Sequence, residues 1–82
     1  MPTTATPQTV ESTITEAISK LGPEPEDVTR DATFESLDID SLDLVEVAQV
    51  VEEEFGVVLK GEDMEKLNTV GDAIDLVVAR AS

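Results

Sequence analysis

Ser41 is the residue of this sequence best suited to carry chemistry, and aspartates at positions 38, 40 and 43 surround it. The chain has no histidine and no cysteine. This excludes the usual base of a serine hydrolase, thiolate nucleophiles, disulfides, and imidazole or thiolate metal sites. Because only carboxylates are near Ser41 in the sequence, the protein is poorly equipped to activate this hydroxyl. We therefore expect no catalytic residue and no enzymatic activity.

Ser41 is predicted to lie at the start of a helix. Asp40 is the better N-cap, and Asp43 then takes the third helical position, which puts Ser41 in the first turn. Its hydroxyl would be exposed beside the positive end of the helix dipole, which favours an attached anion by about 0.3 to 1 kcal/mol. Ser41 is therefore well placed to carry a phosphate ester that a partner enzyme attaches.

The aspartates around Ser41 also raise the possibility of a calcium loop. With Asp38 and Asp40 as the first two ligands, Leu42 falls at the third ligand position, and the loop ends on Gln49 rather than on a glutamate. The glycine of an EF-hand loop is missing as well. We expect no dedicated metal site, and loose binding of divalent cations that relieves charge repulsion stays open.

The segment that follows Asp40 has helical spacing as far as Phe55, and Gly56 can adopt the left-handed cap conformation. Placed at about 100° per residue, its core face consists of Leu44, Val47, Ala48, Val51 and Phe55. The opposite side mixes apolar and polar residues, namely Leu42, Val45, Glu46, Gln49, Glu52 and Glu53. Val50 falls between the two faces and is not assigned.

The charge of this region predicts a basic partner. From residue 31 to residue 65, every charged side chain is acidic except Lys60. Such a run is often only a solvated face, and Leu42 and Val45 could be covered by a neighbouring loop or helix. A helix built for its own stability would alternate charges at i,i+4, so this self-repulsion favours a surface for a cationic partner. The net charge of −14 would repel nucleic acid and anionic membranes.

The rest of the chain predicts further helices around this one. Thr6 and Pro7 form an N-cap and first-turn pair, and the helix they begin has an apolar stripe of Val10, Ile14, Ala17, Ile18 and Leu21. Gly22 and Pro23 end that helix. Residues 22–37 form a long loop that isolated apolar residues pin to the core, and such loops tend to be functional or mobile. The residues that pin it are Val28, Phe34 and Leu37.

A short turn or helix is predicted at residues 62–67, and Thr69 with Asp72 resembles the capping box of a last helix. The apolar stripe of that helix is Val70, Ala73, Ile74, Val77, Val78 and Ala81. No segment alternates like a strand, apart from an ambiguous one at 57–59. The sequence therefore predicts an all-α fold, a small bundle of three longer helices plus one short helix.

One small domain is expected. Residues 1–7 are polar and proline-rich and read as a flexible tail, which leaves 8–82 as a single domain with an aliphatic core. No signal peptide or membrane-spanning segment is recognisable. We expect a cytoplasmic monomer.

The sequence resembles the acyl carrier protein family over nearly its whole length, and it is most similar to the discrete carriers of bacterial fatty-acid synthesis. The matching segments are LDIDSLDLVE around Ser41, VVEEEFGV, DVTRDATF and EKLNTVGDAIDLV. Asp38 stands where the family usually has glycine, and Gln49 replaces a commonly apolar residue.

The resemblance implies that a phosphopantetheinyl transferase attaches phosphopantetheine from coenzyme A to Ser41, which Asp40 and Leu42 flank in the family's motif. Acyl groups would travel on this arm as thioesters, and an acyl chain could retreat between the helices. Basic patches of acyl-chain synthesis enzymes would dock on Asp43, Val45, Glu46, Gln49, Glu52 and Glu53. Two alternatives remain: a carrier for a polyketide, aminoacyl or specialised lipid pathway, and an unmodified acidic helical adaptor.

Overall fold

The computed structural model describes residues 5–81 of the chain of 82 residues. Its helical elements are α1 (Pro7–Ser19), the single-turn 3-10 helix η1 (Pro25–Asp27), α2 (Ser41–Phe55), α3 (Gly61–Glu65) and α4 (Val70–Ala81). The predicted bundle of three longer helices plus one short helix is confirmed. The sequence did not predict η1, and the ambiguous segment at 57–59 is not a strand. No helix within residues 5–81 is long and apolar enough to cross a membrane.

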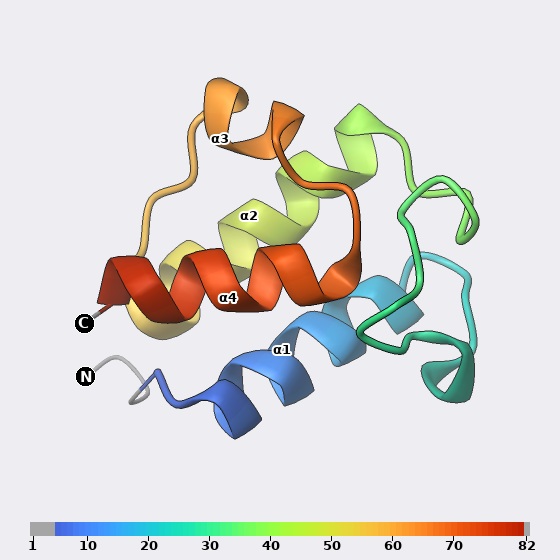
Figure 1. Cartoon of the computed structure of the whole chain (residues 1–82), viewed down its shortest axis with the longest axis horizontal. Helices are drawn as coiled ribbons and strands as arrows, with labels where there is room; N and C mark the ends of the chain where they lie inside the picture. The colour runs from blue at the N-terminus through green and yellow to red at the C-terminus, as the bar shows by residue number, and fades with distance from the viewer. Residues whose placement is uncertain (1–4, 82) are drawn as a thin grey trace.

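The longer helices surround one core, with α1 in contact with both α2 and α4. Figure 1 shows α3 on the side of α2 and α4 that faces away from α1, and the long loop between α1 and α2 at the opposite end of the molecule from the C-terminus. Most of the predicted tail at 1–7 lies outside the described residues. Ala5 packs partly against the core, and Pro7 is already the first residue of α1.

The core is mostly aliphatic, as the composition predicts, and it also contains both phenylalanines, Phe34 and Phe55. The largest side chains that are fully buried are Val10, Ile14, Ile18, Val51, Val70, Ile74 and Val77. The predicted stripes supply all of them, while Leu44 is only half-buried and Ala81 is exposed. Ala81 falls outside the core because α4 ends there. Ile39 and Val57 were not predicted to be core residues, but both are buried although they lie outside every helix.

The loop between α1 and α2 is held in place by the start of α4. The Val70 N–H donates to the Ala32 carbonyl at 2.9 Å, and the Gly71 N–H donates to the Arg30 carbonyl at 3.0 Å. A Cβ at Gly71 would lie 3.0 Å from the same Arg30 oxygen, so this close approach favours glycine, and a larger residue would push the loop away by a few tenths of an ångström. The middle of the loop, at Arg30 and Ala32, is therefore attached to the start of α4.

The predicted N-caps and the Gly56 cap are present, whereas α1 ends at Ser19, before the predicted end at Gly22, so that Leu21 lies in the turn after the helix. The Thr6 hydroxyl accepts the Thr9 N–H at 3.2 Å, and Gly56 ends α2 in the left-handed conformation with φ of 71°. At the start of α4, Thr69 and Asp72 accept each other's N–H groups at 3.1 and 3.0 Å. The N–H groups of Thr69 and Asn68 hold the pKa of the Asp72 carboxyl below its ordinary value.

Asp38 is the one non-glycine residue within 5–81 with a positive φ, 58°. This left-handed conformation costs most residues about 1 to 2 kcal/mol and costs aspartate less, whereas the greater freedom of an unfolded glycine costs about 0.5 to 1 kcal/mol. We therefore expect Asp38→Gly to raise the free energy of unfolding only slightly, by at most about 0.5 kcal/mol. Urea denaturation followed by circular dichroism measures the change.

Asp31→Gly is the matched control for this prediction, because it removes the same charge at an exposed position of the same loop where φ is not positive. Glycine there loosens the unfolded chain without relieving any strain, so stability should fall. An equal fall for both variants would contradict the prediction.

Candidate functional site

Ser41 is the first residue of α2, and its side chain is exposed. The helix is capped by its neighbours: Asp40 Oδ1 accepts the Asp43 N–H at 2.9 Å, and Asp43 Oδ2 accepts the Asp40 N–H at 3.4 Å. The predicted N-cap and third helical position are thereby confirmed. Because these two carboxylates do the capping, the Ser41 hydroxyl is not needed for it and faces solvent.

The helix N-terminus at Ser41 favours an attached anion, while the side chains around it are carboxylates, which are weak bases. The N–H groups of Ser41 and Leu42 occupy the first two helical positions, which have no acceptor within the helix. They add to the positive end of the helix dipole. Across residues 5–81, no group of three or more acidic side chains is placed to hold a metal ion. An exposed hydroxyl at this helix N-terminus has the geometry to carry a phosphate ester.

A hollow of about 330 Å³ lies beside Ser41, between α2 and α3. Its lining residues are Ser41, Leu44, Val45, Gly61, Met64 and Glu65. Aliphatic and thioether groups line most of it, so it fits an alkyl chain better than a polar one. The α3 residues of this hollow were not predicted from the sequence. Met64 could have indicated them, because it is the only long apolar side chain in α3.

The predicted docking residues lie mostly on the surface. Leu42 is 76% exposed and Val45 is 39% exposed, and the exposed polar members are Glu46, Gln49, Glu52 and Glu53. The alternative in which the loop or α3 covers Leu42 is therefore wrong. Val45, by contrast, lines the hollow together with residues of α3. Asp43 differs from the others, because it is half-buried and its carboxylate accepts the capping hydrogen bond.

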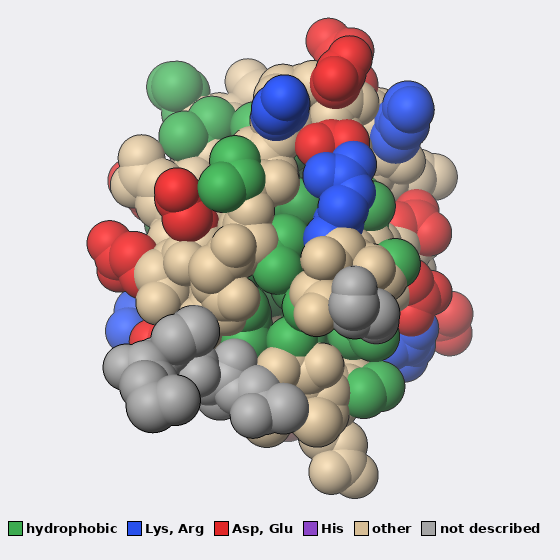
Figure 2. All heavy atoms as spheres, turned by 90° about the vertical axis from the view of Figure 1, so that its left-hand side faces the viewer, with side chains coloured by type: hydrophobic (Ala, Val, Ile, Leu, Met, Phe, Trp, Pro, Cys, Tyr) green, Lys and Arg blue, Asp and Glu red, His purple; other side chains and the backbone are tan. Residues whose placement is uncertain are grey.

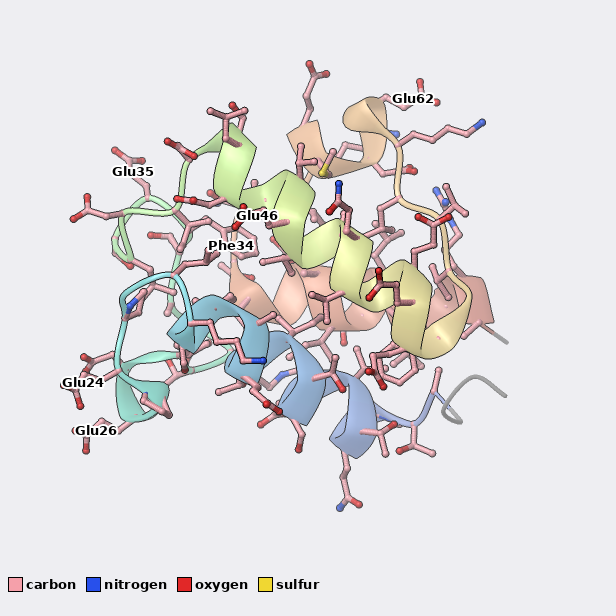
Figure 3. All side chains as sticks on the ribbon, turned by 180° about the vertical axis from the view of Figure 1, so that it is seen from behind. Glu24, Glu26, Phe34, Glu35, Glu46 and Glu62 are labelled. Atoms are coloured by element: carbon pink, nitrogen blue, oxygen red, sulfur yellow. The ribbon has the colours of Figure 1, made fainter. Side chains whose placement is uncertain are left out.

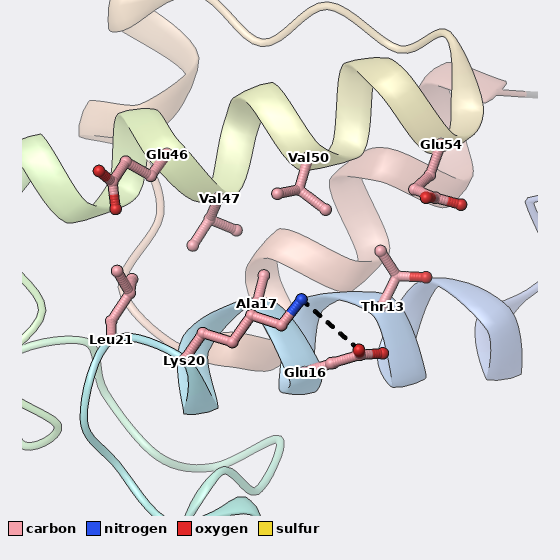
Figure 4. A pocket seen from close by; sticks show the side chains of 9 residues that line it. All are labelled: Thr13, Glu16, Ala17, Lys20, Leu21, Glu46, Val47, Val50 and Glu54. Carbon is pink, nitrogen blue, oxygen red and sulfur yellow. Dashed lines mark ion pairs between the residues drawn. The ribbon is translucent and has the colours of Figure 1, made fainter.

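A second hollow, of about 260 Å³, lies between α1 and α2. Figure 4 shows Glu46 at one end and Glu54 at the other, with Val47 and Val50 facing α1. Val50, which the sequence left unassigned, is thus half-buried on the α1 side of α2. The exposed face of α2 therefore extends from the hollow at Ser41 to the groove along α1, and Glu46 belongs to the α1 side.

Comparison with known protein families matches residues 12–77 to the family described as a phosphopantetheine attachment site. The matched stretch includes Ser41, the hollow beside it and all of α2 and α3. The family's group fits this site, because an exposed hydroxyl at a helix N-terminus lies beside a largely apolar hollow. Since the match covers most of the chain, this protein belongs to the family whose members carry covalently attached phosphopantetheine.

Proposed function

We propose that this protein is an acyl carrier, that its phosphopantetheine arm is attached to Ser41, and that it serves fatty-acid or related acyl-chain synthesis. The supporting observation is the exposed Ser41 hydroxyl at the first position of α2, next to an apolar hollow, in a chain of the phosphopantetheine family. Asp40 and Leu42 flank the attachment point. The protein itself performs no chemistry and acts in the cytoplasm.

The attachment step is a phosphoryl transfer. The Ser41 oxygen forms a bond to the pantetheine-bearing phosphorus of coenzyme A, and the pyrophosphate P–O bond breaks to release adenosine 3′,5′-bisphosphate. The hydroxyl proton passes to a base of the transferase. That base must come from the partner enzyme, because this chain has no histidine or cysteine and the neighbouring side chains are carboxylates.

The proposed cargo is an acyl chain with an apolar tail. Leu44, Val45 and Met64 line the hollow next to Ser41, and burial of alkyl groups there is favourable by about 0.8 kcal/mol per CH₂. The arm supplies the thiol that this cysteine-free chain lacks. Mass spectrometry of the protein purified from its own cells tests the pathway, since fatty acyl thioesters support it and aminoacyl or polyketide thioesters favour the specialised carrier.

Partner enzymes are proposed to dock on the exposed face of α2 through basic patches. The net charge of −14 steers such partners and is screened by salt. Docking that is weak and electrostatic allows rapid release, while the tether raises the effective concentration of the acyl group at each docked enzyme.

Loading of the arm tests the proposed function directly. We expect the purified protein, incubated with coenzyme A, Mg²⁺ and a broad-specificity phosphopantetheinyl transferase, to gain the mass of one phosphopantetheinyl group. Tandem mass spectrometry of the peptide then identifies the modified residue. Absence of any gain, with a known carrier loaded in parallel, would favour the acidic adaptor.

Charge reversal on α2 should weaken docking. We expect Glu46→Lys to raise the dissociation constant for the transferase by about tenfold, since a favourable surface pair is replaced by repulsion. The effect should shrink as salt is added. Surface plasmon resonance at several salt concentrations measures both.

Glu26→Lys is the matched control for docking, because it makes the same change of charge at η1. Figure 3 shows Glu26 of η1 and the preceding Glu24 projecting away from Glu46 on α2. If both reversals weaken binding equally, the partner responds to net charge rather than to the face of α2.

A further inference from the structure

The short helix α3 is anchored by a carboxylate rather than by an apolar face. Asp63 is the only buried residue of this helix and is 7% exposed. A helix of five residues is not stable alone, so its position depends on tertiary contacts. Met64 and the following Leu67 contribute only half-buried apolar groups. The contacts of Asp63 therefore largely decide where α3 lies.

Arg80, near the end of α4, holds this carboxylate with both arms of its guanidinium. Nη2 lies 2.6 Å from Asp63 Oδ1, and Nη1 lies 3.2 Å from Oδ2. The Lys60 N–H also donates to Oδ2, at 3.1 Å. A forked pair of this kind fixes orientation as well as distance. Figure 2 shows basic side chains gathered over this part of the surface, with acidic ones among them.

The position of α3 matters because the helix forms one wall of the hollow beside Ser41. Gly61, Met64 and Glu65 of α3 face Leu44 and Val45 of α2 across it. Arg80 does not line the hollow, and its direct link to the hollow is the ion pair with Asp63 of α3.

We propose that Arg80 and Asp63 form a latch that positions α3 over the hollow and thereby shields an acyl chain carried from Ser41. This inference rests on the proposed function of Ser41. Arg80 is a positioning residue that never touches the cargo. When the latch opens, α3 moves away and the apolar side of the hollow on α2 is exposed to water.

The effect of breaking the latch should be local. Removing the guanidinium leaves the Asp63 carboxylate with one hydrogen-bond donor, the Lys60 N–H, and with Lys66 as a nearby cation. A buried carboxylate that has lost its ion pair is unfavourable. The carboxylate can regain water if α3 swings out, which disturbs less of the core than unfolding the bundle does. Arg80→Gln is the better test variant, because changing Asp63 would also remove its hydrogen bond to the Lys60 N–H.

Arg30→Gln is the matched control. It makes the same substitution and breaks an ion pair of similar length, in which Arg30 Nη2 lies 2.7 Å from Asp75 Oδ1. That pair joins the first loop to α4, and neither partner lines the hollow at Ser41. Any effect of lost charge or of general destabilisation should appear in both variants.

Hydrogen exchange on the unloaded protein tests the positioning of α3. In Arg80→Gln, we expect the amides of Met64 and Leu67 to exchange severalfold faster, while those of α1 keep their rates. Arg80→Lys, which retains the charge without the fork, should lie between the native protein and Arg80→Gln. Arg30→Gln should leave the Met64 and Leu67 amides unchanged.

Thioester hydrolysis on the octanoyl-loaded protein tests the shielding. At mildly alkaline pH, we expect Arg80→Gln to lose its octanoyl group severalfold faster than the native protein and Arg30→Gln. The latch proposal requires both faster amide exchange in α3 and faster thioester hydrolysis in Arg80→Gln. Equal hydrolysis rates or unchanged exchange in α3 would overturn this proposal. Failure to load Ser41 at all would refute the proposed function and the shielding, and exchange would still decide whether Arg80 holds α3.

Discussion

Ser41→Ala should abolish the addition of phosphopantetheine while leaving the fold intact. The substitution removes the oxygen that would form the ester bond, so the loss should be complete rather than partial. Stability should hardly change, because Asp40 and Asp43 cap α2 and alanine is the best helix former. Intact mass after incubation with coenzyme A, Mg²⁺ and the transferase measures loading, and circular dichroism measures the fold.

Ser36→Ala is the control for this prediction. Ser36 is an exposed serine in the loop before α2, where its hydroxyl donates to the Thr33 carbonyl at 2.8 Å. We expect Ser36→Ala to accept phosphopantetheine as fully as the native protein, since no role in attachment is predicted for the Ser36 hydroxyl. A phosphopantetheinyl group on the Ser41→Ala chain would contradict the assignment of Ser41 and move the attachment to another residue.

Ile74→Ala should bring the domain close to unfolding. Ile74 is fully buried in α4, and truncation of such a side chain costs about 2 to 5 kcal/mol because a cavity remains. Domains of this size are stable by roughly 0.05 to 0.15 kcal/mol per residue. The loss is therefore a large share of the total stability. Thermal and urea unfolding measure the change.

Val58→Ala provides the comparison for Ile74. Val58 is 53% exposed, and surface substitutions away from special features usually change stability by less than about 0.5 kcal/mol. An unfolding midpoint for Ile74→Ala equal to that of Val58→Ala would mean that the core around α4 is not packed as described.

The local features of this chain were predictable from its sequence. Helical spacing and cap residues lie within a few positions of one another, so α2 could be placed between Asp40 and Gly56 and its core side assigned. Helical spacing also placed Ser41 in the first turn of α2 and Leu42 on the side away from the core. Such predictions need only the geometry of the α-helix, which is the same in every protein.

Val28 and Phe34 were predicted to pin the first loop to the core and are buried there, but two other core residues outside the helices were not predictable from helical spacing. Ile39 and Val57 are buried in irregular segments, where no periodicity marks the inward direction. Leu44 and Val50 lie near the edges of the α2 face, where burial depends on how closely α1 and α3 approach. Sequence spacing alone does not specify those distances.

The hollow beside Ser41 and the latch behind it were decided by tertiary structure alone. Ser41 and Met64 are far apart in the sequence and meet because α3 folds back over the start of α2. Asp63 and Arg80 are separated by 17 positions, yet their side chains form a forked ion pair. In the sequence, nothing distinguishes Asp63 from the other acidic residues of the chain. Only packing reveals that it is buried, because desolvation and pairing depend on neighbours from another helix.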